Sequence, residues 1–562
     1  MRERSVRRFN AYEAIVSTHA TTWHDGGAAV FLPLTGAIYA ISAERIGDRY
    51  KHSWNSAIAL DHLANLLHVD LQSANVFYDC SNPGETGVLE RDGHHYYHAM
   101  EAYSGSGWVN STILVVDGQG PQDGRNWSTS IWSGTNGEVT LVEDVTSSDL
   151  PFVPQSLGHF YSAIGAAAGI RNLNAEGTTM ALAGVGAPSP LVNFLANKVF
   201  IDARGLMQPT PEFTAALLAH TLGRDFYEWG DPDEQQALIW NEYLAHRNSL
   251  PATNSRDIGE DDANFAFAGQ DALQNCLASL VDRAYSVAPS MNLCLSGGVA
   301  LNCVANSFVR QNGPFRRVYV SSAPGDDGQA LGRLWATIRL LGYPPNPTGR
   351  SRSPYLGPVH RPHDTARAAA LAVEKGYTVH KTLTSGEAAS IVAQGIAKGE
   401  IWGICRGRSE LGPRALGNRS ILADPRRIEM KARLNELKDR EPYRPFAPVV
   451  PIEAAISYFE SSGPSPYMSF TSMVRPEFQS LLGAITHADG STRTQTLSRG
   501  ANSVLESILA EVFKSSGLPI VLNTSFNRGG EPIVETPIDA VETGSAMELD
   551  GMLIGRWACW RA

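Results

Sequence analysis

Histidine and aspartate residues occur at spacings that suit a divalent metal ion. The segment GHHYYH places His94 and His98 four positions apart, so on a helix both imidazoles face the same way. Asp117 follows at the end of a predicted strand, and Asp326 or Asp327 could supply a second carboxylate. Imidazole and carboxylate ligands together suit iron, zinc or manganese. We therefore predict a metal centre here, with an exposed histidine-rich turn as the alternative.

Glycine-rich turns follow several predicted strands. The motifs are HDGGA, VDGQG, LSGGVALN and GDDGQALG. Such turns leave backbone N–H groups free to bind phosphate, and a helix N-terminus adds a favourable dipole. Each turn alone could be an ordinary turn. Together they indicate an actin-like, ASKHA-type nucleotide fold, whereas neither GxxxxGK[ST] nor GxGxxG occurs in a phosphate-loop context.

Composition limits the class of protein. A chain of 562 residues is too long for one core, and 43% hydrophobic with 18% charged residues is typical of a folded protein. The net charge of −11 argues against a nucleic-acid partner. Six cysteines without a CxxC pair fit a reducing compartment. Without a signal peptide or a long apolar run, we expect a cytoplasmic protein with no membrane span.

Strand-like and helix-like segments alternate along the chain, which predicts an α/β architecture. A hairpin is expected from 27–34 and 37–42, a helix at 56–69 and a buried strand at 111–120. Strand–turn–helix units are expected at 292–310 and 316–341, and helix-then-strand units at 364–383 and 386–405. The Pro- and Gly-rich segment 341–364 indicates a linker. We therefore predict two α/β domains, residues 1–345 and 346–562.

Motifs along nearly the whole chain resemble those of the NodU-type O-carbamoyltransferases, a family that includes nodulation-factor enzymes and tobramycin-type antibiotic-tailoring enzymes. The first half contains HDGGA, GHHYYHA, VVDGQG, LCLSGGVALNCVAN and APGDDGQALG in this order. The second half contains GRSELGPRALGNRSILADPR, KDREPYRPFAPVV, HADGSTRTQT and VLNTSFNRGGEPIVETPIDA.

The resemblance implies an enzyme that works in two steps. A C-terminal YrdC-like domain would use carbamoyl phosphate, ATP and Mg²⁺ to form carbamoyl adenylate. The N-terminal actin-like domain, similar to threonylcarbamoyl-transferring enzymes, would then pass the carbamoyl group to a hydroxyl of a small natural product. A divalent metal, iron in the first place, would hold the adenylate. A homodimer is a further expectation.

The resemblance also implies roles for residues of the N-terminal domain. His24 is the candidate general base, because histidine transfers protons near neutral pH. Of Asp326 and Asp327, the resemblance favours Asp326 as the fourth metal ligand, because it lies two positions before Gly328. The expected adenylate-binding residues are Ser296, Gly297, Gly298, Asn302 and Asn306.

In the C-terminal domain the implied ligands of carbamoyl phosphate and ATP are mainly cations, since an acidic protein must concentrate positive charge where polyanions bind. The candidates are Arg414, Arg419, Lys438, Arg444, Arg493, Asn523 and Ser525. A solvated or ion-paired surface charge is the alternative for any one of them.

Alternative functions are a tRNA threonylcarbamoyl transferase-like enzyme and a non-catalytic nucleotide-binding protein. A hydrogenase-maturation type is disfavoured because no CxxC occurs. The loop AEGTTMALA departs from the family pattern by lacking a lysine, which puts its nucleotide contact in question. Segment 205–262 matches no chemical motif.

Overall fold

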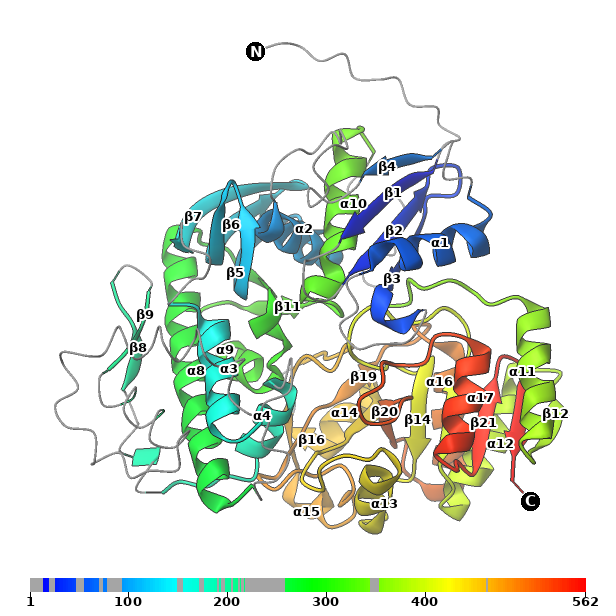
Figure 1. The fold of residues 1–562 in the computed structure, drawn as a ribbon. Coiled ribbons are helices and arrows are strands. Elements are labelled where there is room, and N and C mark those ends of the chain that lie inside the picture. Colours follow the sequence, from blue (N-terminus) through cyan, green and yellow to red (C-terminus); the bar gives the residue numbers. More distant parts are fainter. Residues whose placement is uncertain are drawn as a thin grey trace.

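The computed structural model has a mixed α/β fold, as predicted (Figure 1). His24 and most of segment 205–262 lie outside the residues that it describes. The described residues are 14–19, 26–46, 55–69, 74–77, 93–148, 155–170, 176–189, 192–193, 198–203, 206–210, 213, 217, 258–343, 353–460 and 463–561.

The first sheet contains the predicted hairpin. Its strands, in spatial order, are β3 (Ala37–Ser42), β2 (Gly27–Leu32), β1 (Ile15–His19) and β4 (Asn75–Phe77). Helix α1 (Ser56–Leu67) covers one face and α10 (Gln329–Leu340) the other. Alternate residues of β2 take part in these two cores: Val30 packs with α1, and Phe31 packs with α10.

The second sheet carries the strands that end near the histidines. Its order is β11 (Arg317–Val320), β10 (Asn292–Ser296), β5 (Asn110–Gln122), β6 (Arg125–Thr135) and β7 (Glu138–Ser148). Helix α2 (His94–Ser106) covers one face. On the other face lie α3 (Leu157–Ala167), α8 (Glu260–Val287) and α9 (Cys303–Asn312).

The two sheets and their helices form successive layers. Helix α10 lies between the first sheet and α2, which in turn covers the second sheet (Figure 1). Helix α4 (Glu176–Ala183) packs on α8, and β8 (Val199–Ile201) pairs with β9 (Met207–Pro209). Each of the two sheets of the N-terminal half is therefore covered by helices on both faces, and α10 and α2 lie between the sheets.

The C-terminal half is a three-layer structure around one mixed sheet. Its strands are, in spatial order, β12 (Thr378–Lys381), β22 (Trp557–Trp560), β21 (Gly551–Ile554), β13 (Trp402–Cys405), β14 (Arg419–Ala423), β20 (Val521–Ser525), β15 (Ala447–Pro451) and β19 (Gln495–Leu497). Neighbouring residues of β14 face opposite sides, since Ile421 and Leu422 belong to different cores.

Helices cover both faces of this sheet. One face holds α12 (Ser385–Lys398) and α16 (Ser503–Ser516). The other holds α11 (Pro362–Glu374), α17 (Pro537–Ala546), α13 (Glu429–Leu437) and α14 (Ile452–Tyr458). A short helix and a small sheet complete this half: α15 (Pro476–Gln479), β16 (Phe459–Glu460), β17 (Ser472–Val474) and β18 (Ser491–Thr492).

Local sequence explains several helix starts. Pro362 occupies the first turn of α11, where its missing N–H costs nothing. The side chains of Thr384 and Asn502 accept hydrogen bonds from backbone N–H groups and so cap α12 and α16. None of the described helices combines the length and apolar composition that a membrane crossing requires.

The strand predicted at 111–120 is longer than expected. We expected it to end in a glycine turn at Asp117, but β5 continues to Gln122. Its pairing with β6 instead shifts register between Val116 and Gly120. Such a bulge bends a strand and redirects its side chains without ending it, so Asp117 lies in an irregular stretch inside a strand.

Candidate functional site

Helix α2 holds the two histidines on one face. It begins at His94, directly after Gly93, and its first two turns place His94 Nε2 and His98 Nε2 3.2 Å apart. Both side chains are buried. The i, i+4 spacing predicted this pairing, because residues four apart are neighbours on a helix surface.

The irregular stretch of β5 directs Asp117 toward these histidines. Its Oδ2 lies 2.8 Å from His94 Nε2, and its Oδ1 accepts a hydrogen bond from the Gly298 N–H at 2.8 Å. The turn after β10 must come close for this contact. Gly297 there has a φ of +88°, and a Cβ at this position would overlap the backbone of Val116. Glycine is therefore required by both conformation and space.

Asp326 completes the group from the 3-10 turn η5 (Asp326–Gly328). Its Oδ1 lies 3.4 Å from His94 Nε2 and 3.3 Å from His98 Nε2. The four ligand atoms of His94, His98, Asp117 and Asp326 all lie within 4.8 Å of one another. Bonds of about 2.1 Å to nitrogen and oxygen ligands separate neighbouring ligand atoms by about 3–3.5 Å. These side chains therefore fit one divalent ion.

The charges in this group also favour a cation. Burial opposes ionisation of Asp117, but His94 and His98 outweigh it and hold its pKa well below the ordinary range. Burial likewise disfavours a protonated His98, yet the carboxylates of Asp117 and Asp326 raise its pKa to about 10. Two ionised carboxylates in a buried site need a neighbouring positive charge, which a divalent metal would supply in place of the proton.

His95 is not part of this group. Its Nδ1 lies 2.7 Å from Ser130 Oγ, and burial lowers its pKa to about 3. Of the three histidines in GHHYYH, only His94 and His98 belong to the candidate metal group.

The asparagines predicted to bind adenylate are engaged within the protein. Asn302 caps α9 by accepting from Ala305 N, and its Nδ2 donates to Gln270. Asn306 Nδ2 donates to the carbonyls of Ala300 and Ser469. Of the predicted adenylate-binding residues, it is Gly298 that contacts the metal group directly.

Three of the predicted C-terminal cations lie close together, and a fourth arginine, Arg440, which was not among the predicted ligands, lies with them. Arg414, Arg444 and Arg493 influence one another electrostatically, and Arg440 lies in the same field. Burial and repulsion between these guanidinium groups lower the pKa of Arg414 and of Arg440 to about 9, and lower that of Arg493. We call these four residues the arginine cluster. Mutually repelling, partly buried cations are expected where a polyanion binds.

The signal for Arg440 was its position in KDREPYR, between the predicted Lys438 and Arg444. Its Nε donates to Asn435, and its guanidinium lies 4.6 Å from the centre of the Phe446 ring.

The other predicted C-terminal ligands are held by the protein itself. Lys438 Nζ donates to the carbonyl oxygens of Ser525 and Asn527 and to Asn527 Oδ1. Ser525 Oγ also donates to Asn527 Oδ1, and Asn523 Nδ2 donates to Ala415 O and Gln495 Oε1. Lys438 and Ser525 thus share a partner, which places them together near the end of β20.

Arg419, also predicted among the phosphate ligands, lies in the core with no exposed side-chain surface. Its guanidinium donates to the carbonyl oxygens of Arg406, Asn418 and Glu535 and lies 3.5 Å from the Glu535 carboxylate. These contacts compensate its charge within the core. In the arginine cluster, by contrast, Arg444 has a half-exposed ion pair with Glu441 at 3.6 Å, and the pKa values of Arg414, Arg440 and Arg493 are lowered.

The arginine cluster lies against the segment that also supports the metal group. Arg414 Nη2 is 3.4 Å from the carbonyl oxygen of Leu301, three residues after Gly298. Arg414 is also influenced by Asp327, the neighbour of Asp326, and Arg493 interacts with Cys303 at the start of α9. The two sites therefore share the turn from β10 to α9.

Comparison with known proteins shows the protein family to which this chain belongs. The family model "Carbamoyltransferase N-terminus" matches residues 78–334, and "Carbamoyltransferase C-terminus" matches 393–561. Nodulation protein NolO of Bradyrhizobium diazoefficiens is 34% identical over 82% of this chain and 77% of its own length. The chain belongs to the carbamoyltransferase family, and the predicted carbamoyltransferase enzyme is confirmed.

Other relatives are similar over different shares of their length. Nodulation protein NolNO of Sinorhizobium fredii is 34% identical over 83% of this chain but only 63% of its own length. Nodulation protein U of the same species is 36% identical over 47% of this chain and 44% of its own. The crystal structure of T. kodakarensis HypF aligns with 60% of this chain and 48% of its own, at 15% identity and a TM-score of 0.30, which does not establish a shared fold.

Proposed function

We propose that this carbamoyltransferase activates its donor with ATP. Carbamoyl phosphate and water give carbamate and phosphate, and carbamate attacks the α-phosphorus of ATP to form carbamoyl adenylate and pyrophosphate. A hydroxyl of a small natural product then attacks the carbamoyl carbon, which releases AMP and a proton and leaves an O-carbamate. The observation that carries this proposal is the contact of the arginine cluster with the turn that supports the metal group.

The arginine cluster would bind the anionic donor and nucleotide. Guanidinium groups hold phosphate through paired, charge-assisted hydrogen bonds. Lys438, Asn523 and Ser525 line the strand end nearby and would orient the carbamoyl group, although their present hydrogen bonds would have to be shared. Mg²⁺ would accompany ATP. This assignment corresponds to a YrdC-like domain over residues 346–562.

The N-terminal half would perform the transfer, as an actin-like domain over residues 1–345. Its alternating layers of helix and sheet support that assignment. His94, His98, Asp117 and Asp326 would hold a divalent metal, iron in the first place, which would bind a phosphate oxygen of the adenylate. His24, outside the described residues, is proposed as the base that removes the hydroxyl proton. The acceptor and a homodimer stay predictions.

The test is pyrophosphate release from ATP and Mg²⁺ by the metal-loaded protein, with and without carbamoyl phosphate and without an acceptor. We expect release to depend on carbamoyl phosphate. Arg444→Ala should lower the rate at subsaturating donor about tenfold or more, because a hydrogen bond to a charged group contributes about 1.5–3 kcal/mol.

A matched control is Arg433→Ala, because Arg433 forms an exposed ion pair with Asp550 away from the cluster. It should leave the rate unchanged. Release that ignores carbamoyl phosphate, or that survives Arg444→Ala, would contradict the proposal and favour a protein that only binds nucleotide.

A further inference from the structure

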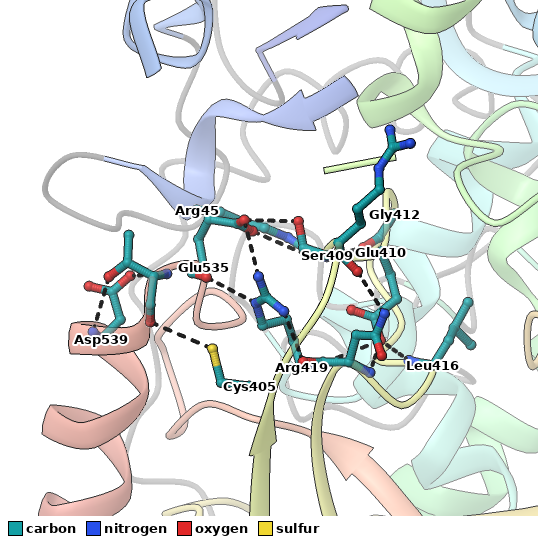
Figure 2. Close-up of polar contacts among 12 residues, drawn as sticks. Arg45, Cys405, Ser409, Glu410, Gly412, Leu416, Arg419, Glu535 and Asp539 are labelled. Carbon is teal, nitrogen blue, oxygen red and sulfur yellow. Dashed lines mark hydrogen bonds and ion pairs between the residues drawn. The ribbon is translucent and has the colours of Figure 1, made fainter. Parts of the chain in front are cut away.

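The loop that carries Arg414 is held by hydrogen bonds from its own residues. We call residues 409–418, between β13 and β14, the Arg414 loop. Glu410 Oε1 accepts from the backbone N–H groups of Leu416 and Asn418, at 2.7 and 2.8 Å (Figure 2). These bonds fold the loop back on itself. They do not, however, determine how the loop sits relative to the rest of the protein.

A buried carboxylate anchors one end of this loop. Glu535 Oε1 accepts from Ser409 Oγ at 2.9 Å and lies 3.5 Å from Arg419 Nη2 (Figure 2). It also lies 3.5 Å from His360 Nε2. Burial opposes ionisation of Glu535, but Arg419, His360 and Arg45 outweigh it and lower its pKa to about 2. A fully buried, ionised carboxylate of this kind has its position set by its cations.

The third cation comes from the first sheet, far away in sequence. Arg45 ends the short 3-10 turn η1 (Ala43–Arg45) after β3 and is 1% exposed. Its Nη2 donates to the carbonyl oxygen of Gly412 at 2.5 Å, and its Nη1 lies 3.9 Å from Glu535 Oε2 (Figure 2). Arg45 therefore joins the N-terminal half both to the anchor of the Arg414 loop and to the loop itself.

The opposite side of the loop is confined as well. Gly412 has a φ of +107°, and a Cβ there would overlap the carbonyl oxygen of Ser322. Leu411 is buried in the core that α10 forms with the first sheet. Gly412 is thus enclosed between Arg45 and Ser322, in the segment that leads to Asp326. Arg414, which belongs to the arginine cluster, follows two residues later.

We infer that Arg45 and Glu535 are positioning residues for the donor site, which set the place of Arg414 through Gly412 and Ser409. Docking of the first sheet on the C-terminal half would thereby complete the anion site. A buried ion pair is weak evidence for stability alone, since apolar residues of similar volume often do as well. Its contribution here is a defined loop position, and an error of about 1 Å in such a position can cost about 10²-fold in rate.

This inference rests on the proposed function, but its first test does not need turnover. Binding of inorganic pyrophosphate, without ATP, is measured by calorimetry for the full chain and for Arg45→Met, Arg45→Lys, Arg414→Ala and Arg361→Met. Arg361 is the matched control, because it also joins the two halves, donating to the Asn65 carbonyl at 2.9 Å, without contacting the Arg414 loop. Circular dichroism and thermal unfolding show which variants are folded at the assay temperature.

We expect Arg45→Met and Arg414→Ala each to weaken pyrophosphate binding about tenfold. In Arg45→Met the reason is that Arg414 is no longer held in its position. Arg45→Lys retains a cation whose ammonium can still donate a hydrogen bond, and it should recover most of the affinity. Arg361→Met should bind like the wild type. In the donor assay, Arg45→Met should raise the KM for carbamoyl phosphate more than it lowers kcat, a pattern that mere loss of stability does not produce.

Three results of the binding experiment would each overturn the inference: equal affinity in folded Arg45→Met, equal weakening in Arg361→Met, or no pyrophosphate binding by the wild type. If Arg45→Met fails to fold, Glu535→Gln is compared with the wild type in the same way, and unchanged affinity in that variant overturns the inference. Weakened binding in Arg45→Met, with no carbamoyl-phosphate-dependent release by the wild type, would uphold the inference and reject the proposed function.

Discussion

Arginine side chains in the C-terminal half take two roles, and their partners decide which. Arg419 is surrounded by carbonyl oxygens and the Glu535 carboxylate, so its charge is compensated in the core. Arg414 and Arg493 instead lie near other cations, and burial with mutual repulsion lowers their pKa. A cation held against repulsion gains most from an incoming anion. The cluster is therefore the stronger candidate for donor binding.

The metal group yields a prediction at the residue scale. His94→Ala removes one of four converging ligands, so the purified protein should lose its bound divalent metal. Elemental analysis of the metal content measures this. The control is His95→Gln, because His95 is a neighbouring buried histidine that contacts Ser130 and lies outside the group. Equal metal content in the two variants would contradict the assignment.

At the scale of secondary structure, two irregularities create the site. The register shift in β5 directs Asp117 toward α2, and the tight turn after β10 places the Gly298 N–H on the Asp117 carboxylate. A regular strand alternates its side chains strictly and would offer no such freedom. The α2 helix contributes only the spacing of the histidines. The position of the Asp117 carboxylate depends on the irregular stretch inside β5, and that of the Asp326 carboxylate on the 3-10 turn η5.

Gly297→Ala tests this turn. A Cβ at φ +88° is strained and would overlap the Val116 backbone, so we expect a loss of about 1–3 kcal/mol in stability and reduced metal content. Thermal unfolding and elemental analysis provide the readouts. Gly177→Ala is the control, because Gly177 is exposed in α4 with open space around its Cα. It should be neutral or slightly stabilising. Similar behaviour of the two variants would exclude a special requirement at Gly297.

At the scale of the whole molecule, the two halves are joined by specific polar contacts. Helix α9 of the N-terminal half bonds to the C-terminal segment through Asn306 to Ser469 and Ser307 to Thr471. On the other side of the junction, Arg45 reaches the Arg414 loop. Two separate contact regions restrain rotation of one half against the other. The donor and transfer sites are thereby kept adjacent.

The network at this junction predicts a pH dependence of stability. The pKa of Glu535 falls from an ordinary 4.5 to about 2, so its ionised form stabilises the folded protein fully above pH 4.5. That contribution is lost as the pH falls from 4.5 toward 2. The stability advantage of the wild type over Glu535→Gln should therefore shrink across this range, measured by urea midpoints. Exposed Glu477→Gln is the control, and a constant advantage of wild type over Glu535→Gln would contradict the role of the network.

Local features of the structure could be predicted from the sequence because they depend on neighbours along the chain. The i, i+4 histidines, the hairpin at 27–42 and the strand–turn–helix around Gly297 all appear as expected. Motifs such as GPRALGNRS were specific enough to give the family, which the comparisons confirm. Backbone periodicity and glycine turns are local properties, so the sequence determined them by itself.

Only the tertiary structure decided which similar residues share a task. Nothing in the sequence separates Arg419 from Arg414, because their difference lies in Glu535 and its neighbours, more than a hundred residues away. The pairing of Arg45 with Gly412 and Glu535 has no local signal at all. Asp117 likewise acquires its place only when β10 packs beside β5. Desolvation and hydrogen bonding depend on the groups that folding brings together, and the order of residues along the chain does not reveal them.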